Sequence, residues 1–231
     1  MTWQMPTTVD QVLRAKADNP DATVVAGGTF LGILVRSGLV ESDEWISLQN
    51  VRELTRMQAS GDLSVGAMVT HRRLELDSQV TGVWPGVSAA FKAVASPRVR
   101  NVATMGGVLA DADYASDPPS MLVASGAVAE VASVRGSRRI PVEDLIVGHY
   151  ATTLDEDEII TRVVVPRPTG AAVYRKLRTR SQEDRPASSV AAVIHGETVR
   201  VVVGAVSDRP HHRRRVCRLE AGRRGFRTRD R

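Results

Sequence analysis

The 231-residue sequence predicts an α+β protein, because short apolar runs typical of strands alternate along it with helices that have clear start signals. Residues 22–26 and 159–165 are rich in valine and isoleucine and are expected to form buried strands. Helices are expected after Thr8, which begins a capping-box sequence, and from Pro85, which suits the first position of a helix. The chain is long enough to bury a sizeable core.

The other elements follow from apolar runs and capping residues in chain order. We expect helices near residues 8–19, 31–35, 71–76, 85–95 and 121–124. We expect strands near residues 22–26, 45–48, 57–59, 63–67, 127–134, 138–140, 159–165, 171–177, 189–195 and 198–206. Residues 22–35 then form a strand, a glycine loop and a short helix, a common arrangement for holding phosphate.

Two glycine pairs, Gly27-Gly28 and Gly106-Gly107, are the most informative local feature. Paired glycines permit positive φ and a close approach to a ligand, and successive N–H groups in such a turn bind anions. Either pair alone is more simply read as a tight turn. Two pairs about eighty residues apart favour one ligand held at two points, such as a dinucleotide with a central pyrophosphate.

The net charge of +5 is unevenly distributed. Residues 211–231 hold nine arginines against two acidic residues, whereas residues 1–210 hold 22 basic and 24 acidic residues. The main part of the chain therefore has a net charge of −2, which does not support a nucleic-acid-binding face.

The chain has one cysteine, Cys217, which excludes an internal disulfide, a four-thiolate zinc site and a complete iron–sulfur site. No signal peptide and no run of transmembrane length is present in the sequence, so a cytoplasmic protein is expected.

Common catalytic and nucleotide fingerprints do not fit. The sequence has no Gly-x-Gly-x-x-Gly and no Gly-x-Ser-x-Gly, and Ile33-Leu34 stand where a P-loop requires Lys and Ser/Thr. Among the acidic residues, Asp111, Asp113 and Asp117 are the group that most invites a metal, but the histidines lack ligand spacing. We therefore expect no catalytic residue and no metal ligand in this chain.

Three segments are expected from changes in composition. Residues 1–168 form the main domain, residues 170–207 begin a second α+β domain with three strands, and residues 208–231 form a basic tail. The abrupt start of the arginine-rich segment suggests a truncated or frame-altered end. A genuine basic tail that docks an acidic partner is the alternative.

Four stretches carry a resemblance to a known family, in the right order along residues 1–207. They are Val25-Ala26-Gly27-Gly28-Thr29, Val65-Gly66-Ala67-Met68-Val69-Thr70-His71, Val99-Arg100-Asn101-Val102-Ala103-Thr104-Met105-Gly106-Gly107, and Ser116-Asp117-Pro118-Pro119. With them the chain resembles the FAD-binding medium subunit of the molybdenum hydroxylases, which include aerobic carbon monoxide dehydrogenase and xanthine dehydrogenase. The family implies a two-lobed FAD-binding domain of the PCMH (vanillyl-alcohol oxidase) type, followed by an α+β C-terminal domain.

The resemblance also implies roles for individual residues. The FAD pyrophosphate would be wrapped by the backbone of Val25, Ala26, Gly27, Gly28, Thr29, Phe30 and Leu31. A second contact, to phosphate or ribityl, would come from Thr104, Met105, Gly106 and Gly107. Asp117 would accept hydrogen bonds from ribityl or ribose hydroxyls, Ile160 would pack near the flavin ring, and Lys176 would reach the flavin side of the pocket. Val108 departs from the polar residue that often follows the second glycine pair in the family.

The function implied is that of an electron-transfer subunit of an FAD-dependent oxidoreductase. Electrons would pass from the iron–sulfur clusters of a small [2Fe-2S] subunit through FAD to NAD+, a quinone or another acceptor, while a large molybdopterin-binding subunit oxidises the substrate. The chain would thus belong to a hetero-oligomer, with no nucleic acid as partner. Two alternatives stay open: a stand-alone flavoenzyme of the same fold, and a non-catalytic truncated remnant.

Overall fold

The computed structural model describes residues 1–181 and 183–215, and for residues 211–215 the backbone alone. Its helices are α1 (Val9–Asp18), α2 (Leu31–Arg36), α3 (His71–Leu76), α4 (Ser78–Val83), α5 (Pro85–Lys92), α6 (Pro97–Arg100), α7 (Met105–Ala110), α8 (Asp117–Ala124) and α9 (Val142–Leu145), with one 3-10 helix, η1 (Arg52–Thr55). Its strands are β1 (Thr2–Gln4), β2 (Thr23–Val25), β3 (Glu44–Ser47), β4 (Met57–Ser60), β5 (Asp62–Gly66), β6 (Val128–Ser133), β7 (Gly136–Pro141), β8 (Ile146–Gly148), β9 (Ala151–Thr152), β10 (Ile159–Val165), β11 (Ala172–Leu177), β12 (Ser188–His195), β13 (Thr198–Gly204) and β14 (His211–Arg215).

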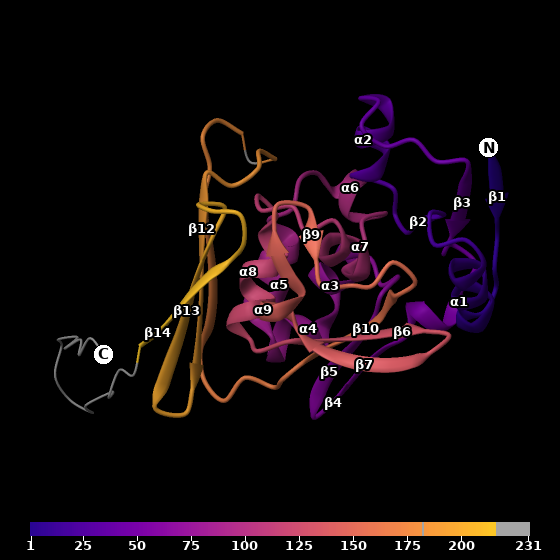
Figure 1. Ribbon diagram of the computed structural model, residues 1–231. Helices are drawn as coiled ribbons and strands as arrows, with labels where there is room; N and C mark the ends of the chain where they lie inside the picture. The colour runs from indigo at the N-terminus through magenta and orange to yellow at the C-terminus, as the bar shows by residue number, and fades with distance from the viewer. Residues whose placement is uncertain (182, 216–231) are drawn as a thin grey trace, which may run out of the picture.

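The N-terminal lobe is a small parallel sheet with the order β1-β3-β2, packed against α1. The side chain of Thr8 accepts a hydrogen bond from the N–H of Gln11, so the expected cap starts α1. Val12 of α1 and Ile46 of β3 are fully buried in the core of this lobe. The lobe stands at one side of the molecule in Figure 1.

The second lobe is a five-stranded antiparallel sheet with the order β4-β5-β10-β6-β7 and a group of short helices. Thr70 and Pro85 begin α3 and α5 as the sequence predicts; the side chain of Thr70 accepts a hydrogen bond from the N–H of Arg73. Large, fully buried side chains such as Phe91, Leu109 and Met121 form its core with residues of the sheet.

The C-terminal sheet has the order β11-β12-β13-β14 and is antiparallel throughout. One face packs on α5 and α8, where Tyr174, Ala191, Val193 and Val202 are buried (Figure 1). The backbone of β14 extends this sheet inside the basic segment that starts at residue 208, although its sequence has no apolar periodicity. Residues 216–231 of that segment lie outside the described residues.

The two lobes meet on β10. Ile159 packs in the core of the N-terminal lobe, whereas the next residue, Ile160, packs in the core of the second lobe. Both are buried, because successive side chains of a strand point to opposite faces and each face here is covered by a different core. An irregularity in the pairing of β10 with β6 follows between Ile160 and Arg162. The start of β10 therefore connects the cores of the two lobes.

Most of the expected elements are present, with shifted ends. The helix that begins at Pro85 ends at Lys92, and α6 follows directly at Pro97. The second glycine pair, expected as a loop, lies within α7, and the elements β1, α4, α9, β8 and β9 were not expected. Among the described residues no helix is long and apolar enough to span a membrane.

Candidate functional site

A cleft with a volume of about 460 Å³ lies between the two lobes and the C-terminal sheet. Its wall includes the first glycine segment (residues 25–31) and the second glycine segment (residues 104–107). The start of β10 and the end of β11 also contribute to it. Of the residues implied by the resemblance, all except Val25 and Met105 line it. Segments far apart in the sequence thus come together at one cavity.

Val25 and Met105 have other positions. Val25 lies in β2, where its carbonyl accepts a hydrogen bond from the N–H of Leu48 at 2.9 Å, and its neighbour Val24 lines the cleft instead. Met105 is fully buried in the core of the second lobe. The structure does not bring these two side chains to the cavity.

The first glycine segment is built by two different constraints. Gly28 has φ of 65°, in the left-handed region that favours glycine. Gly27 has no room for a side chain, because a Cβ there would lie 2.1 Å from the carbonyl oxygen of Val102. At Gly27 the first glycine segment is therefore in direct backbone contact with the chain just before the second one. The N–H groups of Gly27, Gly28 and Thr29 donate to no other residue among those described.

The second glycine segment uses its N–H groups within the protein. The N–H of Met105 donates to the carbonyl of Val69 at 2.9 Å, and that of Gly106 to Ala67 at 2.8 Å. The N–H of Gly107 donates to the hydroxyl oxygen of Thr104 at 3.1 Å, which caps α7. This segment lines the cleft, but its amides are already paired. Free main-chain donors come from the first segment.

Asp117 and Lys176, predicted separately, form one buried ion pair. Lys176 Nζ lies 2.9 Å from Asp117 Oδ2 and donates also to the carbonyl of Ala93 at 2.9 Å. The hydroxyl of Tyr174 donates to Asp117 Oδ1 at 2.5 Å. Burial raises the pKa of Asp117, and the hydrogen bonds from Tyr174 and Lys176 oppose that rise. The pair fastens β11 to the start of α8 at the cleft wall.

Two further aspartates follow the second glycine segment. Asp113 is buried and pairs with Arg185, whose guanidinium also lies 5.8 Å from the ring centre of Phe30. Asp111 lines the cleft, and its carboxyl group has no hydrogen-bonding partner among the described residues, although its N–H donates to the carbonyl of Gly107 at 2.9 Å. Burial, with the nearby charge of Asp113, raises the pKa of Asp111 to about 7. The cleft thus contains one carboxyl group that titrates near neutral pH.

His71 lies deep in the wall beneath the second glycine segment. Its Nε2–H donates to the carbonyl of Thr104 at 3.1 Å, its N–H donates to the carbonyl of Ala103, and its ring meets Phe91 edge-on. Nδ1 has no hydrogen-bonding partner among the described residues. Burial lowers the pKa of His71 to about 4, so the ring is neutral at pH 7.

Several residues at the cleft had no assigned role in the sequence. Tyr150 stacks on Phe30 with 5.5 Å between ring centres, has φ of 54°, and donates its N–H to the carbonyl of Ala112, itself at φ 45°. Two strained non-glycine residues thus hold each other beside the cleft. No sequence pattern signals this contact, because the two segments lie far apart in the chain. Arg185 is likewise placed only by the folding of the β11–β12 connection.

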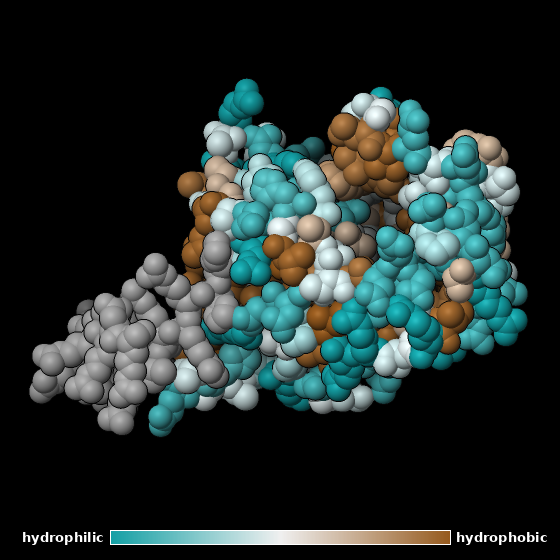
Figure 2. Space-filling model, viewed as in Figure 1, coloured by the Kyte–Doolittle hydropathy of each residue, from teal (hydrophilic) through white to brown (hydrophobic). Residues whose placement is uncertain are grey.

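The helix next to the first glycine segment has an unusual surface. No residue of α2 is buried, and Ile33 and Val35 are exposed. Figure 2 shows a brown, apolar projection in the position of α2. Among the described residues, no group of three or more His, Cys, Asp or Glu side chains could hold a metal ion.

The protein family described as the FAD binding domain in molybdopterin dehydrogenase matches residues 1–168. The chain belongs to this family. The resemblance read from the four sequence stretches is therefore confirmed, and with it FAD as the cofactor of the domain.

Relatives and solved structures agree with this membership. The chain is 38% identical to the nicotine 6-hydroxylase medium subunit of Paenarthrobacter nicotinovorans over 170 residues, 73% of this chain and 60% of the relative. It is 28% identical to the xanthine dehydrogenase FAD-binding subunit of Escherichia coli O157:H7 over 71% of this chain and 57% of the relative. The chain thus spans about three-fifths of the length of these relatives.

Its fold is similar to that of a chain in the crystal structure of quinoline 2-oxidoreductase from Pseudomonas putida 86. The TM-score is 0.87 with 34% identity, over 92% of this chain and 76% of that chain. A chain of carbon monoxide dehydrogenase from Hydrogenophaga pseudoflava is similar with a TM-score of 0.87 and 25% identity, over 92% and 77%. The predicted fold class is confirmed.

Gly27→Ala is expected to lower the free energy of unfolding by about 2 kcal/mol or more, because its Cβ would overlap the carbonyl of Val102. Gly32→Ala is the matched control: no atom lies within 4 Å of the added Cβ, and alanine is the better helix former. Urea unfolding of both variants measures the difference. Equal stability of the two would contradict the close backbone contact.

The stability of the protein is expected to fall between pH 7 and pH 5 through His71. In the unfolded chain His71 is protonated below about pH 6.5, whereas in the folded state its pKa is about 4. Because the unfolded state binds more protons between these values, acid favours unfolding. Between pH 7 and pH 5, His71 is expected to lower the free energy of unfolding by about 2 kcal/mol. His71→Gln should remove that part of the pH dependence, measured as the free energy of unfolding, and His149→Gln at an exposed position should not.

Proposed function

We propose that this chain binds FAD in the cleft with the diphosphate against the first glycine segment. The observation that carries the proposal is the set of main-chain N–H groups at Gly27, Gly28 and Thr29, which have no partner among the described residues and belong to residues that line a mainly apolar cavity. Oxygen atoms of a diphosphate are suited to such donors. The second glycine segment contributes another part of the wall, including Thr104, whose hydroxyl oxygen accepts from Gly107 and for which no donated hydrogen bond is found among the described residues.

The flavin ring is proposed to lie toward the start of β10 and the end of β11. Ile160 provides an apolar surface there, and Lys176 provides a positive charge. The side chain of Lys176 is only 2% exposed. Because that charge is held by Asp117 and by the carbonyl of Ala93, its position is defined before any ligand binds. Bound FAD supplies the redox chemistry, and these residues orient it, exclude water and influence its reduction potential.

We propose further that the chain works as the electron-exit subunit of a molybdenum hydroxylase. Its partners would be a small subunit with [2Fe-2S] clusters and a large molybdopterin-binding subunit, and the electrons would leave to NAD+, a quinone or another acceptor. The support is membership of the family and the names of the relatives, which include a medium subunit and a medium chain. A single cysteine in 231 residues also leaves the iron–sulfur clusters to another chain.

A titration with three flavins tests the cofactor proposal. The purified chain is titrated with FAD, FMN and riboflavin, and binding is followed by flavin fluorescence and by absorption between about 300 and 600 nm. FAD is expected to bind at least about tenfold more tightly than FMN, because only FAD offers a diphosphate to the first segment. A folded chain that binds none of the three, or binds riboflavin as tightly as FAD, would contradict the proposal.

FAD affinity is expected to fall as the pH rises from 6 to 8. Asp111 loses its proton in this range, since its pKa is raised to about 7, and its carboxylate then lies in the same cleft as the negatively charged diphosphate. Asp111→Asn should remove the pH dependence of the dissociation constant. Asp18→Asn, at an exposed residue at the end of α1, should leave that dependence unchanged.

A further inference from the structure

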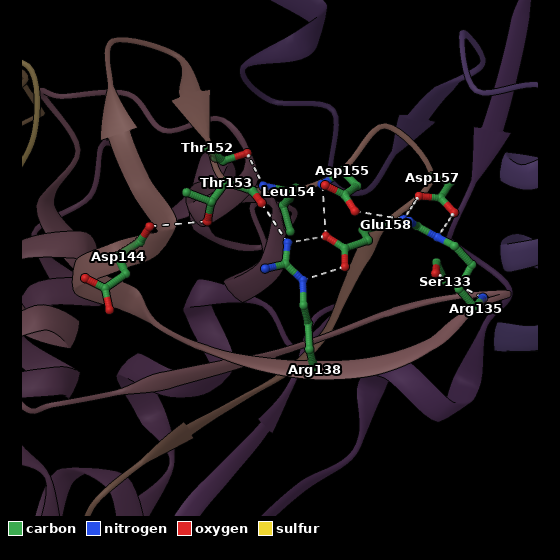
Figure 3. A network of polar contacts seen from close by, with 10 residues as sticks. All are labelled: Ser133, Arg135, Arg138, Asp144, Thr152, Thr153, Leu154, Asp155, Asp157 and Glu158. Carbon is green, nitrogen blue, oxygen red and sulfur yellow. Dashed lines mark hydrogen bonds and ion pairs between the residues drawn. The ribbon is translucent and has the colours of Figure 1, made fainter.

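Two arginines of the β6–β7 hairpin reach across to the acidic connection that precedes β10 (Figure 3). Arg138 holds both carboxylate oxygens of Glu158, with Nε 2.7 Å from Oε1 and Nη2 2.7 Å from Oε2. Nη2 also donates to the carbonyl of Thr153 at 2.7 Å. One guanidinium thus holds both ends of the connection over residues 153–158.

A second arginine holds the middle of the same connection. Arg135 donates to Asp155 at 2.8 Å and to Asp157 at 2.6 and 3.1 Å. Inside the connection, the N–H of Asp155 donates to Glu158 Oε2 at 2.9 Å. In Figure 3 the acidic side chains point toward the two guanidinium groups from one side.

This connection leads directly into the wall of the cleft. Leu154, Glu158, Ile159 and Ile160 all line the cavity. The side chain of Glu158 is only 6% exposed, although the side chain of its partner Arg138 is 45% exposed. Arg138 therefore reaches from the surface to a carboxylate at the cavity and to the residue that precedes Leu154.

The geometry separates Arg138 from an ordinary surface ion pair. Two parallel, short, charge-assisted hydrogen bonds to one carboxylate define both the distance and the angle of the carboxylate. The neighbouring Arg139 is 64% exposed and lies 3.9 Å from Glu130, a pair of the kind that contributes little. Two adjacent arginines of one strand thus have very different contacts.

We propose that Arg138 is a positioning residue of the cofactor cleft: by holding Glu158 and Thr153 it sets the place of Ile159 and Ile160, the residues on which both lobes meet. The proposal rests on the proposed binding of FAD, because Ile160 is placed at the flavin ring there. The effect of Arg138 is indirect; its guanidinium lies on the hairpin and acts through Glu158.

Arg138→Gln and the matched control Arg139→Gln test the proposal in two ways. Hydrogen exchange of the chain without added flavin measures the opening of residues 153–160 directly. Arg138→Gln is expected to speed exchange in this segment by about tenfold or more, with β11–β13 unchanged, whereas Arg139→Gln behaves as the wild type. Arg138→Lys, which keeps the charge but not the bidentate contact, should lie between them.

The second measurement uses the chain loaded with FAD. Arg138→Gln is expected to raise the dissociation constant of FAD about tenfold and to change the visible circular dichroism of the bound flavin, because its apolar wall moves. Arg139→Gln should change neither. Visible circular dichroism reports the surroundings of the ring, so a loss of global stability alone would leave it unaltered.

Two results would overturn the proposal. Exchange over residues 153–160 that is as slow in Arg138→Gln as in the wild type would show that the contact does not hold the connection. Faster exchange with wild-type affinity and an unaltered flavin signal would show that the connection does not position the cleft. If the wild type binds no FAD, the proposed function fails by itself, and the exchange comparison still decides whether Arg138 holds the wall. If Arg138→Gln does not fold, Arg138→Lys supplies both comparisons.

Discussion

The rest of the site depends on the close approach of Gly27 to the carbonyl oxygen of Val102. No side chain can stand between these two backbones, so the first glycine segment rests directly on the chain that leads into α7. That contact joins a loop of the N-terminal lobe to the second lobe. The next two residues, Gly28 and Thr29, line the cavity, and their N–H groups have no partner among the described residues. A packing constraint and a proposed binding surface thus meet at Gly27.

The two glycine pairs look equivalent in the sequence but are used differently. Buried amides need partners, and a chain can supply them from within or leave them for a ligand. In the second pair, the N–H of Gly106 donates to the carbonyl of Ala67 and the N–H of Gly107 donates to the hydroxyl of Thr104. These bonds hold α7 beneath the cleft. Only the first pair keeps donors for a ligand. The asymmetry could not be read from glycine spacing, because it depends on which strand end lies opposite each loop.

Local signals in the sequence are reliable where the physics is local. The Thr8 and Thr70 caps begin their helices because a hydroxyl accepts a hydrogen bond from an N–H three residues later. Nearly all the residues to which the resemblance assigns a role line the cleft, since the motifs describe the backbone that carries them. It did not show that Asp117 and Lys176, 59 positions apart, neutralise each other. Nor could it show the pairing of Arg138 with Glu158, because contacts across a fold carry no signature at either position. The pairing of β14 was missed for a related reason: backbone hydrogen bonds, not apolar periodicity, attach it to β13.

Three of the acidic residues that line the cleft are paired with a cation. Asp117 is paired with Lys176, Asp113 with Arg185, and Glu158 with Arg138, so these carboxylates are compensated by a nearby cation. Compensation lowers the cost of burying each of these charges, and it reduces their repulsion of an anionic ligand. Asp111 lacks such a cation, and its proton is the only compensation available to it among the described residues. A neutral carboxyl group is compatible with a diphosphate nearby and a carboxylate is not. Binding of a doubly charged ligand would therefore draw a proton onto this group, which links the occupancy of the cleft to the proton concentration around it.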